Sequence, residues 1–232
     1  MASARPGAGS QEVGSEAAHL KPVGRGADLL YRSIVGVARL VAKVLWRFEV
    51  VGKDRLPSVG PFILCAVHRS YVDFLIVGMS VPRRMRYMAK DSLWRVSALG
   101  RFIEMIGAFP VDRTGADRTA LRRAEEAIAG GEPLVMFPEG QRRRGPSVTD
   151  MQQGPAFVAC RNRVPIVPVG IGGSDRAMPI GSKMVRPAKV RVVIGEPIYP
   201  DVPLEGRVPR RVVEATTEQL RQTLQDLYDS VR

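Results

Sequence analysis

His68 and Asp73 are the residues of this chain whose types and spacing point most directly to chemistry. They lie five positions apart in the stretch LCAVHRSYVDFLI, which runs from 64 to 76 and is apolar at both ends. A carboxylate that accepts a hydrogen bond from one imidazole nitrogen sets the tautomer of the ring and stabilises its protonated form. The pair could therefore act as a general base toward a substrate hydroxyl. The spacing alone equally allows a structural histidine beside an aspartate that caps a helix.

A second polar stretch, FPEGQRRR over 137–144, has the composition of a phosphate-binding loop. Gly140 permits a close approach between backbone and ligand, and the arginines that follow it can hold phosphate oxygens through two N–H groups. Glu139 could hold an arginine or a backbone turn. A solvated run of charge explains Arg143 and Arg144 equally well.

Lys90 and Arg113 each stand at the end of a predicted strand. Because the loops that follow parallel strands gather at one edge of a sheet, we expect both side chains at the same rim as His68 and the 137–144 stretch. Cations that converge on a His–Asp pair suit a phosphorylated substrate whose hydroxyl is to lose a proton.

The segments that would position these residues alternate between short apolar runs and longer helical patterns. Strands are expected over 61–67, 84–90, 107–113, 133–140, 164–173 and 189–198. Helices are expected over 73–81, 92–107, 116–131, 154–163 and 208–231. This alternation indicates an α/β fold with a largely parallel central sheet flanked by helices.

Three regions are expected along the chain. Residues 1–26 are rich in Gly, Ala and Ser and include the second histidine, His19, so they are predicted to form a disordered tail. Residues 27–49 have the periodicity of an amphipathic helix. Residues 50–232 are expected to form one α/β domain.

The helix expected over 27–49 has two interpretations, because its apolar positions lie on one face and its cations on the opposite face. The apolar positions are Leu30, Ile34, Val37, Val41, Val44, Leu45 and Phe48, and the cations are Arg32, Arg39, Lys43 and Arg47. The apolar face could cover the domain, as in an ordinary surface helix. It could instead lie in a lipid interface, with the cations toward anionic headgroups.

The composition narrows the possible partners. The net charge is +12 and the isoelectric point about 10.5, which favours nucleic acid, an anionic membrane surface or a phosphorylated substrate. Aromatic residues make up only 6% and no zinc-finger, RRM or helix-turn-helix signature occurs, so nucleic acid is not expected. No apolar run is long enough for a transmembrane helix, and no secretory signal is predicted. We therefore expect a cytosolic protein or one on the cytosolic face of a membrane.

The chain contains two cysteines, Cys65 and Cys160. Each is expected to be a small buried residue in a reducing compartment. No Cys-x-x-Cys pair or His–Cys cluster occurs, so no metal site is expected.

Four motifs occur in a characteristic order: His68-x-x-x-x-Asp73, GAFPVDR, FPEGQRR and VPIVPVGI. Together they resemble the four sequence blocks of the glycerolipid acyltransferase family, of the 1-acyl-sn-glycerol-3-phosphate (lysophosphatidic acid) acyltransferase type. The resemblance covers residues 50–200 approximately. One block would be weak support, whereas four in this order are specific.

The resemblance implies a role for each matching residue. His68 corresponds to the catalytic base of the family and Asp73 to the residue that orients it. The residues implied to help bind the phosphate of the acceptor are Lys90, Arg113, Glu139, Gly140 and Arg142.

The third and fourth blocks carry two further implications. Pro165 and Pro168 lie in the fourth block, which shapes the pocket and its acyl side in the family. The third block is usually EGTR, but Gln141 stands here in place of the threonine. Glutamine can still form hydrogen bonds, but its longer side chain leaves open how this loop meets its ligand.

The implied reaction is acyl transfer from acyl-CoA or acyl carrier protein to the sn-2 hydroxyl of 1-acylglycerol 3-phosphate, which gives phosphatidic acid in membrane phospholipid synthesis. No metal or other cofactor is expected. The expected partners are the lysophospholipid, the thioester donor and an anionic membrane surface, with the protein peripheral on the cytoplasmic face. The alternatives are another acceptor, such as glycerol 3-phosphate, another lysophospholipid or a glycolipid, and a non-catalytic basic binding module.

Overall fold

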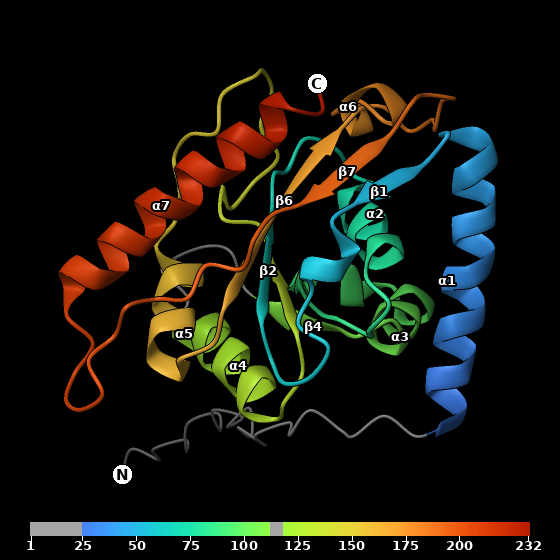
Figure 1. Cartoon of the computed structure of the whole chain (residues 1–232). Coiled ribbons are helices and arrows are strands. Elements are labelled where there is room, and N and C mark those ends of the chain that lie inside the picture. Colours follow the sequence, from blue (N-terminus) through green and yellow to red (C-terminus); the bar gives the residue numbers. More distant parts are fainter. Residues whose placement is uncertain (1–24, 112–117) are drawn as a thin grey trace, which may run out of the picture.

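The described part of the protein is a seven-stranded sheet covered by helices on both faces (Figure 1). The computed structural model describes residues 25–111 and 118–232. The strands are β1 (Glu49–Val51), β2 (Ile63–Ala66), β3 (Arg86–Lys90), β4 (Ala108–Val111), β5 (Leu134–Met136), β6 (Ile166–Gly172) and β7 (Arg191–Ile194). The helices are α1 (Arg25–Leu45), α2 (Asp73–Ser80), α3 (Ser97–Met105), α4 (Arg118–Ala129), α5 (Gly154–Asn162), α6 (Ser174–Ala177) and α7 (Arg210–Asp229), with 3₁₀ turns η1 (Lys53–Arg55) and η2 (Asp91–Arg95).

The strand order across the sheet is β1-β7-β6-β2-β5-β3-β4. Every neighbouring pair is parallel except β6 with β7. Helices α1, α2 and α3 lie on one face of the sheet, and α4, α5 and α7 lie on the other (Figure 1). The predicted α/β class with a largely parallel sheet is confirmed.

The central strands β2, β5 and β6 are buried at every residue. Helices cover both faces of these strands, so they read in the sequence as continuous apolar runs rather than as alternating patterns. This burial makes the middle of the sheet the rigid part of the molecule, from which the polar loops extend.

The two polar stretches, which carry His68 and residues 137–144, follow β2 and β5 and leave the sheet side by side. Cys65 of β2 pairs with Met136 of β5 in the parallel ladder, so the segments after these strands leave the sheet as neighbours. Strands β3 and β4 continue the sheet beyond β5 and end at the same edge. Strand β6 flanks β2 on the other side and leads there into the short helix α6.

The first strand departs from the sequence-based expectation. The helix expected over 27–49 spans Arg25–Leu45, and Arg47 then adopts a left-handed conformation with φ of 43°. The chain turns there into β1, which pairs in parallel with β7 at the edge of the sheet. The tail expected over 1–26 lies outside the described residues apart from its last two, and the division at residue 50 stays a prediction.

Helix α1 is anchored to the domain by a narrow set of residues. Tyr31, Ala42 and Trp46 are buried against the domain, and the Trp46 indole donates to the carbonyl of Arg186 (Nε1···O 3.1 Å). Arg39 donates to the carbonyls of Met79 and Val81, which end α2 and have no partner within their own helix (Nε···O 2.7 Å, Nη2···O 2.9 Å). Arg39 therefore binds the domain and does not face anionic headgroups, as the interfacial interpretation of this helix would have it.

The apolar face of α1 points largely away from the domain. Of the residues expected on this face, Leu30, Val37, Val41 and Val44 are exposed, whereas Ile34, Leu45 and Phe48 are half-buried. Leu29 and Leu40 extend the exposed apolar surface. Near the end of the helix, Leu40, Val41, Val44 and Leu45 form a shallow apolar hollow of about 460 Å³ with Pro187. Among the described residues, none of the helices combines the length and apolar character needed to cross a bilayer.

Helix α7 packs directly on β6 and reaches the carboxyl edge of the sheet. A Cβ atom on Gly170 would lie 2.7 Å from the backbone of Leu227, so glycine is required for this close approach. At the edge, the Gln225 side chain accepts from the N–H of Val148 (2.8 Å) and donates to the carbonyl of Pro146 (3.0 Å). The last helix therefore supports the loop that follows β5.

Candidate active site

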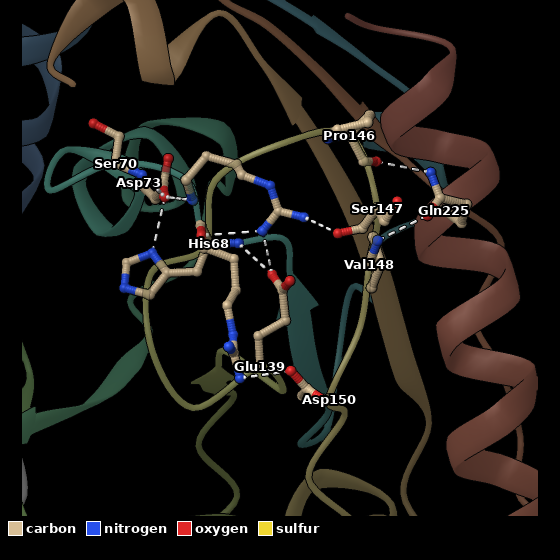
Figure 2. Close-up of polar contacts among 11 residues, drawn as sticks. His68, Ser70, Asp73, Glu139, Pro146, Ser147, Val148, Asp150 and Gln225 are labelled. Carbon is tan, nitrogen blue, oxygen red and sulfur yellow. Dashed lines mark hydrogen bonds and ion pairs between the residues drawn. The ribbon is translucent and has the colours of Figure 1, made fainter. Parts of the chain in front are cut away.

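The structure brings His68 and Asp73 into direct contact at the carboxyl end of β2. His68 Nδ1 lies 2.8 Å from Asp73 Oδ2, and the same oxygen accepts from the N–H groups of Arg69 (2.6 Å) and Ser70 (2.7 Å) (Figure 2). Asp73 is fully buried and its side chain does not cap α2. The carboxylate instead ties down the turn that carries His68, so the helix-capping alternative does not describe this pair.

The imidazole of His68 is held between this carboxylate and an aromatic ring. The ring of Phe137, just after β5, stacks on it with centroids 4.1 Å apart and an interplanar angle of 21°. Figure 2 shows the second ring nitrogen directed away from Glu139. No hydrogen bond to that nitrogen occurs within the described residues, so it is available to take a proton from a substrate.

Glu139 lies behind the catalytic turn rather than on the rim. Its Oε2 accepts from the backbone N–H of His68 (3.0 Å) and from Arg69 Nη1 (2.6 Å). The two charged residues are 1% and 2% exposed, so they form a buried ion pair between the β2 and β5 loops. The geometry fits the role of holding an arginine and a backbone turn, and the carboxylate does not face the solvent where a phosphate would bind.

Arg69 is the residue that sequence reasoning missed, although it stands beside His68 in the motif. Its guanidinium donates to Glu139, to the carbonyl of His68 (3.1 Å) and to the carbonyl of Ser147 (3.0 Å). The guanidinium also lies over the ring of Tyr228 in α7, 4.9 Å from its centroid. One buried side chain therefore joins the turn after β2, the loop after β5 and the last helix.

Gly140 and Gln141 form the bend in the loop after β5. Gly140 has a φ of 68°, which favours glycine, and its N–H is already bonded to the carbonyl of Phe137 (3.0 Å). In the amide orientation that satisfies its surroundings, the Gln141 oxygen accepts from both terminal nitrogens of Arg143 (3.1 Å each). The glutamine that departs from the family pattern is thus engaged by its neighbour in the loop.

Arg142 and Tyr71 bring the loop and the catalytic turn together on the exposed side. The Arg142 guanidinium lies 3.7 Å from the centroid of the Tyr71 ring, a close cation–π contact. Both side chains are exposed, and the neighbouring Arg143 N–H donates to the carbonyl of His68 (2.9 Å), so Arg142 extends into solvent from a segment that lies beside the turn of His68.

The other residues expected at the site lie at different distances along the same edge. Lys90 is exposed at the end of β3, beyond β5. Arg113 lies outside the described residues. Pro168 is buried in β6 opposite Cys65, and Pro165 precedes that strand and accepts from the N–H of Ile63 (3.0 Å).

The cysteines do not offer a nucleophile. Cys65 and Cys160 are both buried free thiols, and burial raises the pKa of each above its ordinary value. In the parts of the chain that the structure describes, no cluster of three or more His, Cys, Asp or Glu side chains could hold a metal ion.

The buried ion pair between Arg69 and Glu139 predicts that one conservative substitution will lower the stability of the protein strongly. Glu139→Gln removes the charge that compensates Arg69, so the free energy of unfolding should fall by about 3 kcal/mol. Glu196→Gln is the matched control, because that carboxylate pairs with Arg55 at the surface with its side chain 76% exposed, and it should change stability by less than ~1 kcal/mol. Urea unfolding followed by circular dichroism measures both, and equal midpoints would contradict the role given to Glu139.

Comparison with known proteins finds a family match that includes this edge of the sheet. The sequence pattern described as Acyltransferase matches residues 47–172, which include β1 to β6 and both polar loops. The solved structure described as the 1-acyl-sn-glycerophosphate (LPA) acyltransferase PlsC from Thermotoga maritima superposes with a TM-score of 0.72 at 23% identity, over 88% of this chain and 81% of that one. That likeness supports the fold.

Two curated relatives share the sequence over most of the chain. The 1-acyl-sn-glycerol-3-phosphate acyltransferase of Bacillus subtilis (strain 168) is 25% identical over 203 residues, which cover 87% of this chain and 98% of the relative. The chloroplastic 1-acyl-sn-glycerol-3-phosphate acyltransferase BAT2 of Brassica napus is 26% identical over 171 residues, and this chain spans about half of its length (49%). Since the family pattern covers more than half of the chain and contains the paired His68 and Asp73, this protein belongs to the Acyltransferase family.

Proposed function

We propose that this acyltransferase moves an acyl group from acyl-CoA or acyl carrier protein to the sn-2 hydroxyl of 1-acylglycerol 3-phosphate, forming phosphatidic acid. The observation that carries the proposal is the His68–Asp73 pair, with Nδ1 and Oδ2 2.8 Å apart, on a turn to which the segment carrying Arg142 is bonded. A base beside a phosphate-binding cation suits an acceptor that carries a hydroxyl and a phosphate. The names of the two relatives at about 25% identity support the same acceptor.

The proposed reaction uses His68 twice. Its free ring nitrogen takes the proton from the acceptor hydroxyl while the oxygen forms a bond to the thioester carbonyl carbon. The carbon–sulfur bond then breaks, and the departing thiolate takes this proton from the imidazolium. Asp73 is fully buried and keeps the imidazole in the tautomer whose outer nitrogen accepts, and it stabilises the imidazolium between the two steps.

The phosphate of the acceptor would be held by side chains on the rim. Arg142 is the principal residue proposed for this role, because its guanidinium is exposed and oriented by Tyr71. Lys90 and Arg113 are proposed to join it from the ends of β3 and β4. Glu139 and Gly140 take part indirectly, since they shape the loop that presents Arg142.

Removing the base tests the proposal directly. His68→Ala should lower kcat about 10²- to 10⁴-fold, because a positioned general base contributes that much to proton transfer. Products of acyl-CoA with 1-acylglycerol 3-phosphate, glycerol 3-phosphate and a lysophospholipid without a free phosphate would be identified by mass spectrometry. Activity within a few-fold of wild type in a variant with unchanged circular dichroism would refute the role of His68, and a preference for another acceptor would replace 1-acylglycerol 3-phosphate.

The contact between Arg142 and Tyr71 predicts a graded effect on acceptor binding. Arg142→Ala should raise KM for 1-acylglycerol 3-phosphate about tenfold or more, since a charged hydrogen bond to phosphate is lost. Tyr71→Leu should raise KM about two- to fivefold, which is the size of a cation–π contact at an exposed site. Tyr71→Phe keeps the ring and should match wild type. A phenylalanine variant as impaired as the leucine variant would show that the hydroxyl, not the ring face, is what Arg142 needs.

We also propose a peripheral position on the cytoplasmic face of the membrane, and the exposed apolar face of α1 supports attachment to a membrane surface. Six apolar side chains there lack cover by the described domain, while the cations Lys43 and Arg47 are exposed near the end of the helix. This arrangement suits an interfacial helix, which would bring the site to the bilayer where the lysophospholipid resides.

Vesicle binding checks this position. The triple change Leu40→Ser, Val41→Ser and Val44→Ser should weaken binding to vesicles of phosphatidylcholine and phosphatidylglycerol at least about tenfold, because each buried apolar side chain contributes roughly 1.5–3 kcal/mol. Leu204→Ser is the control, since Leu204 is 90% exposed on the loop before α7. Cosedimentation measures both, and undiminished binding of the triple variant would assign α1 to an ordinary surface helix.

A further inference from the structure

A second cationic pocket lies beside the catalytic turn. It has a volume of about 470 Å³ and forms where the 143–146 segment, the loop after α6 and the end of α7 meet. Its charged lining consists of Arg69, Arg143, Arg144, Arg232 and one acid, Asp175. Neither Arg142 nor Tyr71 lines this pocket, so it is distinct from the rim assigned to the acceptor phosphate.

The arginines of this pocket have hydrogen-bonding capacity that the protein does not use. Arg69 is 2% exposed, and its Nε is buried without a hydrogen-bond partner among the described residues. Arg143 Nε is also buried without a hydrogen-bond partner among the described residues, although Arg143 Nη2 pairs with Asp150 (3.0 Å). A buried N–H without a partner costs about 1–3 kcal/mol, so an acceptor atom from a ligand would relieve that cost.

The outer arginines are only partly compensated. Arg144 donates to the carbonyl of Ile180 (3.1 Å), and no carboxylate pairs with it in the described ranges. Arg232 pairs with Asp229 of its own helix (2.8 Å) in an exposed ion pair. Three of the four arginines pair with carboxylates that lie outside the lining, so Arg144 supplies most of the uncompensated charge of the pocket. The planar guanidinium groups of the lining favour phosphate oxygens.

We propose that this pocket binds the phosphate groups of the acyl donor, an inference that rests on the proposed thioester-dependent transfer. A thioester donor of either kind carries phosphate: CoA has a diphosphate and a 3′-phosphate, and an acyl carrier protein has the phosphodiester of its pantetheine arm. The pocket volume falls within the usual range for small-molecule sites. Arg69 lines the pocket and follows His68 directly in the chain, so the pocket adjoins the turn that carries His68. The pantetheine arm, which separates the phosphates of the donor from its thioester, would extend from the pocket toward His68 while the acceptor phosphate stays on Arg142.

Direct binding separates this proposal from the catalytic one. Isothermal titration of the full chain without lipid would use CoA, 3′,5′-ADP, pantetheine 4′-phosphate and inorganic phosphate in turn. The double change Arg144→Ser and Arg232→Ser should weaken CoA or pantetheine phosphate at least about tenfold, because charged hydrogen bonds contribute about 1.5–3 kcal/mol each. Arg210→Ser with Arg221→Ser removes the same charge from the exposed face of α7, where both pair with glutamates, and should leave binding unchanged.

The identity of the donor decides which ligand responds. Weakening of CoA and 3′,5′-ADP together indicates the nucleotide of CoA, whereas weakening of pantetheine 4′-phosphate with no response of 3′,5′-ADP indicates the arm of a carrier protein. Equal affinity of wild type and the double variant for all four probes would overturn the proposal, as would binding of inorganic phosphate alone.

Kinetics supply the second readout. In the double variant, KM for the acyl donor should rise about tenfold while KM for the lysophospholipid stays within twofold, and Arg142→Ala should show the reverse. A rise in the lysophospholipid KM instead would assign the pocket to the acceptor and overturn the donor proposal. If wild type transfers no acyl group from any thioester, the proposed function fails, and loss of CoA binding in the double variant would still show the pocket as a phosphate site.

Discussion

The active edge of this protein depends on one buried ion pair, between Arg69 and Glu139. Neither the turn after β2 nor the loop after β5 has regular structure of its own. Glu139 binds the backbone N–H of His68 and the side chain of Arg69, and Arg69 in turn reaches the carbonyl of Ser147. In a site of low dielectric this pairing gives the two loops a single arrangement, because any other would leave a charge buried without a partner. The imidazole of His68 is therefore positioned by an ion pair that lies behind its turn and takes no part in the proposed proton transfer.

The core of the fold was accessible to sequence reasoning because its signal is local. Parallel strands covered on both faces appear as apolar runs, and β2, β5 and β6 are such runs. Strand β1 was missed because it has three residues at the edge of the sheet and exists only through pairing with β7, some 140 residues later. The periodic pattern of the preceding helix ran on into it, and nothing local in that pattern marked the left-handed turn at Arg47.

The contacts of the site likewise divide into local ones, which the sequence indicates, and long-range ones, which it does not. His68 and Asp73 are close in sequence and come together in the structure. The stacking of Phe137 on His68 and the contact of Arg69 with Glu139 join residues about 70 positions apart, and both depend on β2 lying next to β5. A sequence pattern gives the order of strands along the chain but not their order in the sheet, so these partners could not be paired in advance. The family resemblance grouped Glu139 with the phosphate-binding residues, whereas its residue type also allowed it to hold an arginine or a backbone turn, and its surroundings fit that second role.

The close packing of α7 on Gly170 also sets the order in which the site can be assembled during translation. Tyr228 lies under the Arg69 guanidinium, and Gln225 holds the backbone at Pro146 and Val148. These two side chains follow His68 by more than 150 residues, so a nascent chain on the ribosome carries His68 and Asp73 long before the helix that supports their surroundings exists. The growing polypeptide therefore lacks these supporting contacts until α7 has emerged and docked.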